Sequence, residues 1–460
     1  MSRGFTKDPK INSALRHSVK DGVAYSVMTG AGETYFSAFA LFLKASTTQI
    51  GLLASLPSLV SSLSQLFSVW LNHKSITRRR VILSGAGIQA MIWVPLILLP
   101  LMFPQYAVPL LIACIVVYHA SGSVVIPQWS SLMGDLVPER RRGRYFAMRT
   151  RFTSVSAFCA LIVAGLILHV FEKYELAVYG FITIFGIANL ARCISVYHLT
   201  WLVESQTLHP AIEVSFEGVW WKRFKHSRFF HFSLFFALMQ TMVAVGSPFI
   251  AVYMLRDLQF TYVEFMVLSA ATVLMQFLTL NAWGRISDVF GNRLILFVTG
   301  YAIPLIPAMW LLSYNFVYLL FVQLLSGLIW AGFNLSAGNF LYDLISPQKR
   351  PTYLAFHNIL TNLGIFSGAL LGGYLGSVLP KSFSFFAINF NLHSPLLWVF
   401  LLSCLGRLTI GIIFIPRLKE VRTVKPMTVT ELIFRATRFS ALSGLIYDVM
   451  SGGKRGDKEV

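Results

Sequence analysis

Apolar segments of helical length, separated by short polar or basic segments, recur along most of the chain. Because a helix needs roughly 20 apolar residues to cross a bilayer, we expect an all-α membrane protein with twelve transmembrane helices. The breaks between the apolar segments place the first six helices near 22–44, 49–72, 81–103, 107–134, 152–171 and 177–202. The second six lie near 229–255, 262–284, 294–315, 317–345, 354–379 and 395–416.

The two sets predict two six-helix bundles, an amino-terminal one at 22–203 and a carboxy-terminal one at 229–416. The segment 1–21 and the middle loop 204–228 are polar and basic. The tail at 417–460 is expected to contain an amphipathic helix lying on the membrane surface, since its apolar residues recur at helical intervals. Segment 1–21 has no apolar core ending in a cleavage site, so we expect the first apolar run to remain in the mature protein.

Composition and charge agree with a membrane protein. Charged residues make up only 12% of the chain, against about 25% in a typical soluble protein. The net charge is +19, and with these helices 32 Lys and Arg residues fall on the side of the termini and 4 on the other side. Such an excess marks the cytoplasmic face, so we expect both termini in the cytoplasm. The basic loops favour contact with anionic lipid and argue against a nucleic-acid partner.

The two bundles contain similar motifs at equivalent places, which indicates an internal repeat. "DLVPERRRGRYFAMR" begins at Asp135 and "DLISPQKRPTYLAFH" at Asp343, and Ser46–Gln49 and Thr261–Glu264 each fit a capping box. Small residues four apart let helices approach closely in a membrane; they occur at Ser156, Ala160, Ala164, Gly364, Gly368, Gly372 and Gly376. Two parallel six-helix halves are a known plan of transporters, with the substrate site between them near mid-membrane.

The segment "GRISDVFGNR" joins the second and third helices of the carboxy-terminal bundle. It resembles the loop signature of the major facilitator superfamily, Gly-x-Leu-Ala-Asp-x-x-Gly-x-Arg/Lys. Gly284, Asp288, Gly291 and Arg293 match that signature. The resemblance extends over about residues 20–416. It implies the superfamily fold of two pseudo-symmetric six-helix bundles, and a motif that locks the inner gate while the transporter faces outward.

Elementary chemistry assigns a role to each matching residue. Gly284 and Gly291 allow backbone conformations that side chains forbid. Asp288 is expected to accept hydrogen bonds from the positive end of a neighbouring helix, and Arg293 to offer the counter-charge. The equivalent segment of the first bundle, "LNHKSITRRR", keeps only Arg80 of this pattern. An Asp-based latch is therefore in doubt in that half.

Glu33 is the only acidic residue at the centre of an expected span. An ionisable group at membrane depth usually faces a cavity or a partner. One interpretation makes Glu33 a proton-binding group or a contact for a cationic substrate. The other makes it a structural carboxyl paired to a Tyr or Arg within the bundle. The sequence leaves both open.

Other polar residues at mid-depth are candidates for the substrate or proton pathway, although a buried polar residue is more often an interhelical hydrogen bond. They are Tyr35, Gln65, His119, Gln240, Gln276, Asn334, Asn339 and Asn362. Arg192 and Arg407 occupy equivalent positions in the sixth and twelfth spans. Their symmetry favours gate or structural charge pairs with Asp135 and Asp343 over substrate binding.

The sequence contains no phosphate-binding Gly-rich Lys-Ser/Thr loop and no cluster with metal-ligand spacing. We therefore expect no enzyme activity, no cofactor, no metal and no direct use of ATP. The first interpretation is a monomeric secondary transporter of the inner or plasma membrane, moving a small solute by alternating access, with proton coupling as a hypothesis. The alternative keeps the fold without transport, as a sensor or an assembly factor that delivers a hydrophobic ligand.

Overall fold

The computed structural model describes residues 6, 8–71, 76–138, 141–204, 227–345, 350–380, 382–385, 388–391 and 393–421. Within these residues the chain is helical apart from one short β-hairpin and the connecting turns. Nearly all of the middle loop 204–228 lies outside the described residues. The part of the tail that is expected to form an amphipathic helix lies outside them as well.

Each half of the chain forms a consecutive series of helices. The amino-terminal half contains α1 (Pro9–Ala31), η1 (Glu33–Tyr35), α2 (Phe36–Phe42), α3 (Thr47–Leu71), α4 (Arg78–Met102), η3 (Pro104–Tyr106), α5 (Ala107–Leu136), α6 (Arg142–Lys173) and α7 (Ala177–Leu199). The carboxy-terminal half contains α9 (Arg228–Gly246), α10 (Phe249–Val252), η5 (Tyr253–Asp257), α11 (Tyr262–Phe290), α12 (Asn292–Ala302), α13 (Leu305–Met309), α14 (Phe316–Asp343), α15 (Arg350–Val378), β1 (Ser382–Phe385), β2 (Ile388–Asn391), α16 (Leu396–Phe414) and η7 (Ile415–Arg417).

Ten helical stretches in the described part of the chain are long and apolar enough to cross a membrane. They correspond to the expected third to twelfth spans. The expected first and second spans also form helices, α1–α2 and α3, but α1 carries Arg16, Lys20 and Asp21 and α3 is rich in serine. Twelve crossings, with both termini on one side, therefore stay a prediction.

The first helix begins at Pro9, well before the apolar run that starts near residue 22. Pro9 occupies the first turn of α1, where a missing N–H removes no helical hydrogen bond. Asp8 caps the helix, because its Oδ1 accepts a hydrogen bond from the Lys10 N–H at 2.7 Å. Leu15 and Asp21 are buried in the packing of α1 against α6 and α7. Much of the expected segment 1–21 is thus part of the bundle.

Three of the expected spans are interrupted. The first breaks at Gly32 between α1 and η1, and a Cβ atom there would lie 2.2 Å from the Trp93 ring. The seventh breaks near Pro248 and ends in η5, which is a π-helical turn. The ninth breaks at Pro304 between α12 and α13. Proline interrupts a helix because it lacks the N–H that the preceding turn requires.

The features that indicated an internal repeat are present in the structure. Both capping boxes form: Gln49 Oε1 accepts from the Ser46 N–H at 2.9 Å, and Glu264 Oε2 accepts from the Thr261 N–H at 2.8 Å. The glycines of α15 bring it against α9, where a Cβ atom on Gly368 would lie 2.1 Å from the Thr241 carbonyl oxygen. These contacts confirm that the small residues permit close helix packing.

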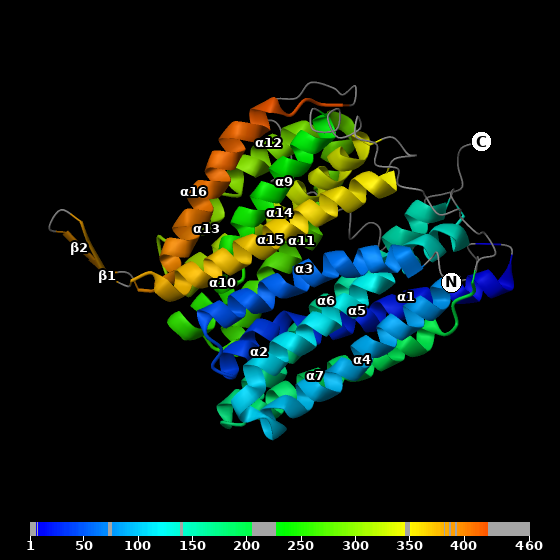
Figure 1. The fold of residues 1–460 in the computed structure, drawn as a ribbon, viewed down its shortest axis with the longest axis horizontal. Helices are drawn as coiled ribbons and strands as arrows, with labels where there is room; N and C mark the ends of the chain where they lie inside the picture. The colour runs from blue at the N-terminus through cyan, green and yellow to red at the C-terminus, as the bar shows by residue number, and fades with distance from the viewer. Residues whose placement is uncertain are drawn as a thin grey trace.

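The two halves meet mainly along two helix pairs, α3 with α15 and α6 with α11. In Figure 1 the halves lie together around α2 and α10 and diverge from there. We call the end of the bundle that contains α2 and α10 the distal end. It also carries Lys44, Lys173 and the β1–β2 hairpin. The opposite end, here the basic end, carries Arg78, Arg142 and the last turn of α14.

Contacts across the distal end hold the halves together. Arg256 Nη1 of η5 donates to Thr47 Oγ1 of α3 at 3.0 Å. A Cβ atom added at Gly373 would lie 3.0 Å from the Cα atom of Gly51. The rings of Tyr35 and Phe265 lie 6.0 Å apart. The distal end is therefore closed by direct backbone and side-chain contact between the halves.

Candidate functional site

Glu33 lies in the break between α1 and α2, half-buried inside the amino-terminal half. The hydroxyl of Tyr118, in α5, donates a hydrogen bond to Glu33 Oε1. Phe36 and Trp93 pack against Tyr118 with ring centroids 5.8 and 5.5 Å away. His119 follows Tyr118 in α5 and is half-buried. The Glu33 carboxyl, at a break between two helices, is thus paired to Tyr118, whose ring packs among other aromatic rings.

A chain of buried polar groups continues from this tyrosine. The Tyr118 carbonyl oxygen accepts from Gln89 Nε2 at 3.0 Å, and Gln89 Oε1 accepts from Arg192 Nη2. Arg192 Nη1 donates to Ser195 Oγ at 2.8 Å, and Ser195 Oγ donates to Asp21 Oδ1 at 2.6 Å. Four helices, α1, α4, α5 and α7, contribute to this chain. A buried charge is tolerated only when such partners satisfy it.

These contacts contradict the expected pairing of Arg192 with Asp135. Arg192 is only 3% exposed, and its described hydrogen bonds go to Gln89 and Ser195. Asp135 instead forms an ion pair with Arg78, whose Nη1 lies 2.8 Å from Asp135 Oδ2. The physical reason is that α1 begins early and brings the carboxylate of Asp21 to the centre of the bundle, beside α7.

The equivalent pairing of Arg407 with Asp343 is wrong as well. Arg407 is 4% exposed, and its Nη2 donates to the Val243 carbonyl oxygen at 3.4 Å. Its buried Nε has no hydrogen-bond partner among the described residues. Asp343 Oδ2 accepts from Asn292 Nδ2 at 3.2 Å. Arg192 and Arg407 are therefore similarly buried. Among the described residues, only Arg192 is connected to an acid, Asp21, through Ser195.

Two of the pathway candidates share a cavity between the halves. Gln276 of α11 and Asn334 of α14 line it together with Trp330 and with Ser154 and Phe158 of α6. Its volume is about 400 Å³ and most of its lining is apolar. The cavity is large enough for a small organic molecule. Two of the predicted pathway residues, Gln276 and Asn334, thus line one open space.

The other pathway candidates are dispersed. Gln65, Gln240 and Asn362 lie half-buried on α3, α9 and α15, and their side chains make no hydrogen bond within the described residues. Tyr35 is fully buried, and its hydroxyl donates to the Leu161 carbonyl oxygen at 2.8 Å. Tyr35 therefore contributes to packing at the distal end rather than presenting a free hydroxyl. Asn339 belongs to the cluster at the basic end described next.

The loop signature adopts only part of the expected geometry. Gly291 has φ 81°, a left-handed conformation that favours glycine, so its expected role is confirmed. Gly284 lies within α11, and no atom would approach its Cβ within 4 Å, so its expected conformational role is wrong. Asp288 and Arg293 are exposed, and within the described residues their side chains form no hydrogen bond or ion pair. The expected Asp288 latch is not formed among these residues.

Two other residues of the same segment, Ser287 and Asn292, are buried and form a polar cluster instead. Ser287 Oγ donates to Asn292 Oδ1 at 2.6 Å, and Asn339 Nδ2 donates to Ser287 Oγ at 3.1 Å. Asn292 Nδ2 donates to Asp343 Oδ2. The cluster joins α11, α12 and α14 at the basic end. Ser287 stands where the signature has Ala, and Asn292 stands at an unspecified position, so the signature does not predict this cluster.

We expect Asn292→Ala to destabilise the carboxy-terminal half by about 1–3 kcal/mol, because it leaves buried partners of Asn292 without a hydrogen bond. Arg293→Ala, one residue away and exposed, is the matched control and should change stability by less than about 0.5 kcal/mol. Thermal unfolding of both variants in detergent checks this. Equal stability of the two variants would show that the cluster contributes nothing.

In the amino-terminal half, Ser75 stands where the signature has its acid and Arg78 where it has its second glycine, and Arg78 forms an ion pair at the basic end. Arg78 Nη1 bonds Asp135, and Arg78 Nε donates to Glu204 Oε1 at 3.0 Å. Glu204 Oε2 also accepts from the Arg79 N–H at 2.9 Å. The arginine of the loop and the acid of α5 thus form an ion pair within this half, in place of an Asp-based latch.

Two helical halves, related by a repeat and containing ten stretches able to cross a membrane among the described residues, define a multi-pass membrane protein with transporter architecture. The sequence matches the Major Facilitator Superfamily over residues 22–247 and again over 230–445. The chain belongs to this superfamily, which confirms the resemblance seen in its loop signature. The match of each half separately is what an internal repeat produces.

Solved structures with the same fold are transporters. A point mutant of the nucleoside transporter NupG has a TM-score of 0.68 and 15% identity, covering 89% of this chain and 100% of its own. An inward-facing bacterial homologue of the iron transporter ferroportin has a TM-score of 0.63 and 16% identity, covering 88% of this chain and 98% of its own. An inward-facing bacterial homologue of the human lysosomal transporter Spinster has a TM-score of 0.59 and 14% identity, covering 96% of this chain and 99% of its own. Among curated proteins, no sequence matches this chain.

Family and fold together support a role in membrane transport, and they confirm the predicted multi-pass membrane location. At these identities, likeness to the solved transporters establishes the fold and not the cargo.

Proposed function

We propose that this protein is a monomeric secondary transporter that moves a small solute by alternating access, with twelve spans and both termini in the cytoplasm. The observation that carries the proposal is the difference between the two ends of the bundle. At the distal end, a hydrogen bond and aromatic contacts join the two halves. At the basic end, the ion pair of Arg78 with Asp135 and the hydrogen bonds of Asn292 each lie within one half.

This arrangement is expected of a state that is open toward the cytoplasm. The excess of Lys and Arg puts the basic end inside the cell, so the closed distal end is the outer gate. The exposed Asp288 and Arg293 then belong to an inner gate that is not engaged. Rocking of the two halves about the site between them would close the basic end and open the distal one.

Glu33 is the residue we propose for proton coupling. It is half-buried at a helix break and accepts a hydrogen bond from Tyr118. From Tyr118, a chain of hydrogen bonds extends through Gln89 to Arg192, Ser195 and Asp21. A buried carboxyl whose surroundings change between two states can bind a proton in one and release it in the other. The cargo is proposed to be neutral, amphipathic or weakly cationic, because the cavity with Gln276 and Asn334 is mostly apolar.

Glu33→Gln is expected to abolish the dependence of uptake on a proton gradient, since the amide keeps the size of the side chain but does not titrate. A thermal-shift screen of a solute library first finds a ligand, and its uptake into proteoliposomes is then measured with and without a pH gradient. Glu264→Gln is the matched control, because glutamine can replace glutamate in a capping box. Unchanged coupling in Glu33→Gln would remove the carboxyl from the mechanism.

The same proteoliposomes distinguish transport from the non-transporting alternative. A sensor or assembly factor would bind the ligand without moving it. Ligand binding with no flux, in either direction and at any gradient, would therefore favour the alternative and contradict the proposed transport.

A further inference from the structure

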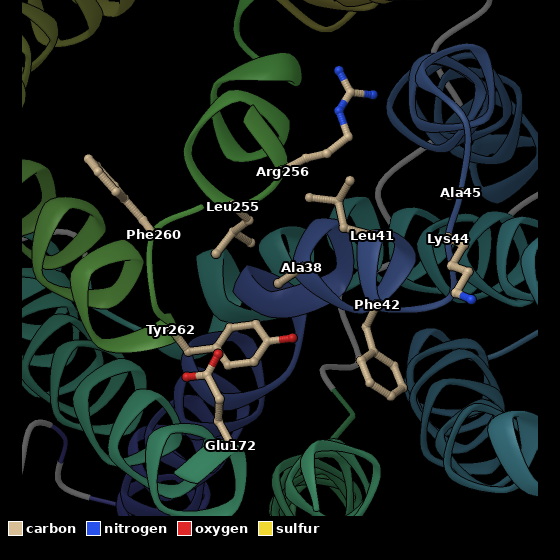
Figure 2. A pocket seen from close by; sticks show the side chains of 10 residues that line it. All are labelled: Ala38, Leu41, Phe42, Lys44, Ala45, Glu172, Leu255, Arg256, Phe260 and Tyr262. Carbon is tan, nitrogen blue, oxygen red and sulfur yellow. The ribbon is translucent and has the colours of Figure 1, made fainter. Parts of the chain in front are cut away.

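A second cavity lies at the distal end, between the two halves and away from Glu33. Its volume is about 460 Å³, which falls within the range of small-molecule sites. The amino-terminal half contributes α2, the turn that follows it and the end of α6 (Figure 2). The carboxy-terminal half contributes η5 and the start of α11. A molecule in this cavity would touch both halves.

The cavity carries two opposite charges that have no ionic partner. Glu172 of α6 and Lys44 of the α2–α3 turn form no ion pair or side-chain hydrogen bond within the described residues. Glu172 Oε2 is buried without a hydrogen-bond partner. A buried carboxylate oxygen without a donor is costly, and an added N–H group would remove that cost. Glu172 thus points to a ligand with a donor, of which an ammonium group is the strongest.

The third charged residue of the cavity is already compensated. Arg256 Nε lies 2.8 Å from Asp257 Oδ1, and Arg256 Nη1 donates to Thr47. Figure 2 shows its guanidinium directed away from Glu172. Lys44 is therefore the cation left to receive an anionic group.

The two unpaired charges lie on different sides of an apolar region. In Figure 2, Glu172 and the ring of Tyr262 lie next to each other on one side of α2, and Lys44 lies on the other side. Ala38 and Leu41 of α2 and Leu255 of η5 lie between them. A carboxylate beside an aromatic ring suits an ammonium group, since both attract a cation.

We infer that this cavity binds a small zwitterion of the amino-acid or dipeptide class. Its ammonium group lies against Glu172 and Tyr262, its carboxylate against Lys44, and its apolar body against Ala38, Leu41 and Leu255. A ligand without an ammonium group leaves Glu172 Oε2 without a donor, and a ligand without a carboxylate leaves Lys44, which is exposed, paired only with solvent. Because the ligand contacts both halves, it binds the state with a closed distal end and stabilises that state.

The test is calorimetric titration of the purified full-length protein in detergent with L-leucine and with L-leucyl-L-leucine. At least one of the two is expected to bind, and its N-acetyl and methyl-ester derivatives are expected to bind at least about tenfold more weakly. Glu172→Gln and Lys44→Met should each weaken binding by a similar factor. Glu175→Gln and Lys173→Met change the same charges nearby, outside the cavity, and should leave the affinity unchanged.

No binding of either probe at millimolar concentration would overturn the inference. Binding that survives both Glu172→Gln and Lys44→Met, or that the blocked derivatives match, would overturn it too. None of these readouts requires flux, so the outcome is independent of whether the protein transports its cargo.

Discussion

Replacing Asp21 with alanine is expected to lower the free energy of unfolding by about 3–5 kcal/mol, because it removes one member of a buried charged network and leaves the others. Asp21 is 4% exposed and accepts a hydrogen bond from Ser195. Its Oδ2 also lies 3.6 Å from Arg149 Nη2. Without the carboxylate, Arg192 and Arg149 remain inside the bundle as uncompensated cations.

Unfolding by SDS in mixed micelles measures this change. Asp288→Ala is the matched control, since Asp288 is an exposed acid whose side chain has no bond within the described residues. Its effect should stay within about 0.5 kcal/mol. Equal midpoints for the two variants would mean that the chain of polar groups from Asp21 to Tyr118 does not stabilise the bundle.

Gly373→Val is expected to shift the protein strongly toward a state with an open distal end. A Cβ atom at this position would lie 3.0 Å from Gly51 Cα and 3.3 Å from the Thr47 carbonyl oxygen, both in the other half. Valine adds two further carbons there, and overpacking of this kind costs about 1–3 kcal/mol in the closed state. The ratio of closed to open distal ends should fall by about fivefold to 150-fold.

Electron spin distances between labels at Lys173 and Gln259, exposed residues of the two halves at the distal end, report this shift. The control is Gly338→Val, in α14 of the same half, where no atom would come within 4 Å of a Cβ. Its distance distribution should match that of the unsubstituted protein. A Gly373→Val distribution that also matches it would show that the backbone contact with Gly51 does not hold the distal end closed.

Much of the fold could be predicted from the sequence, because membrane helices are encoded locally. Both capping boxes involve residues within one turn, and the glycines of α15 are read from their spacing alone. The start of α1 at Pro9 could not be predicted by apolarity, since Arg16, Lys20 and Asp21 make this part of the helix polar. Its burial depends on partners in α6 and α7 that are distant in the sequence.

The same limit explains the candidate site. Glu33 was found because an acid in an apolar run is visible in the sequence, but its partner Tyr118 is 85 residues away. The sequence does not reveal that α1 begins at Pro9 and carries Asp21 into the bundle. The sequence therefore suggests Asp135 as the partner of Arg192, whereas Asp21 is the acid connected to it through Ser195. Nothing in the sequence links the charges of the distal cavity, Lys44 and Glu172, because only the meeting of the two halves places them around one space.

The most direct test of alternating access compares both ends of the bundle in the same molecules. A second label pair at Arg80 and Arg285, exposed residues of the two halves near the basic end, is measured beside the distal pair, with and without Gly373→Val. Alternating access predicts that the distal distance lengthens while the basic-end distance shortens. Distances that stay fixed at both ends, or that lengthen together, would contradict it.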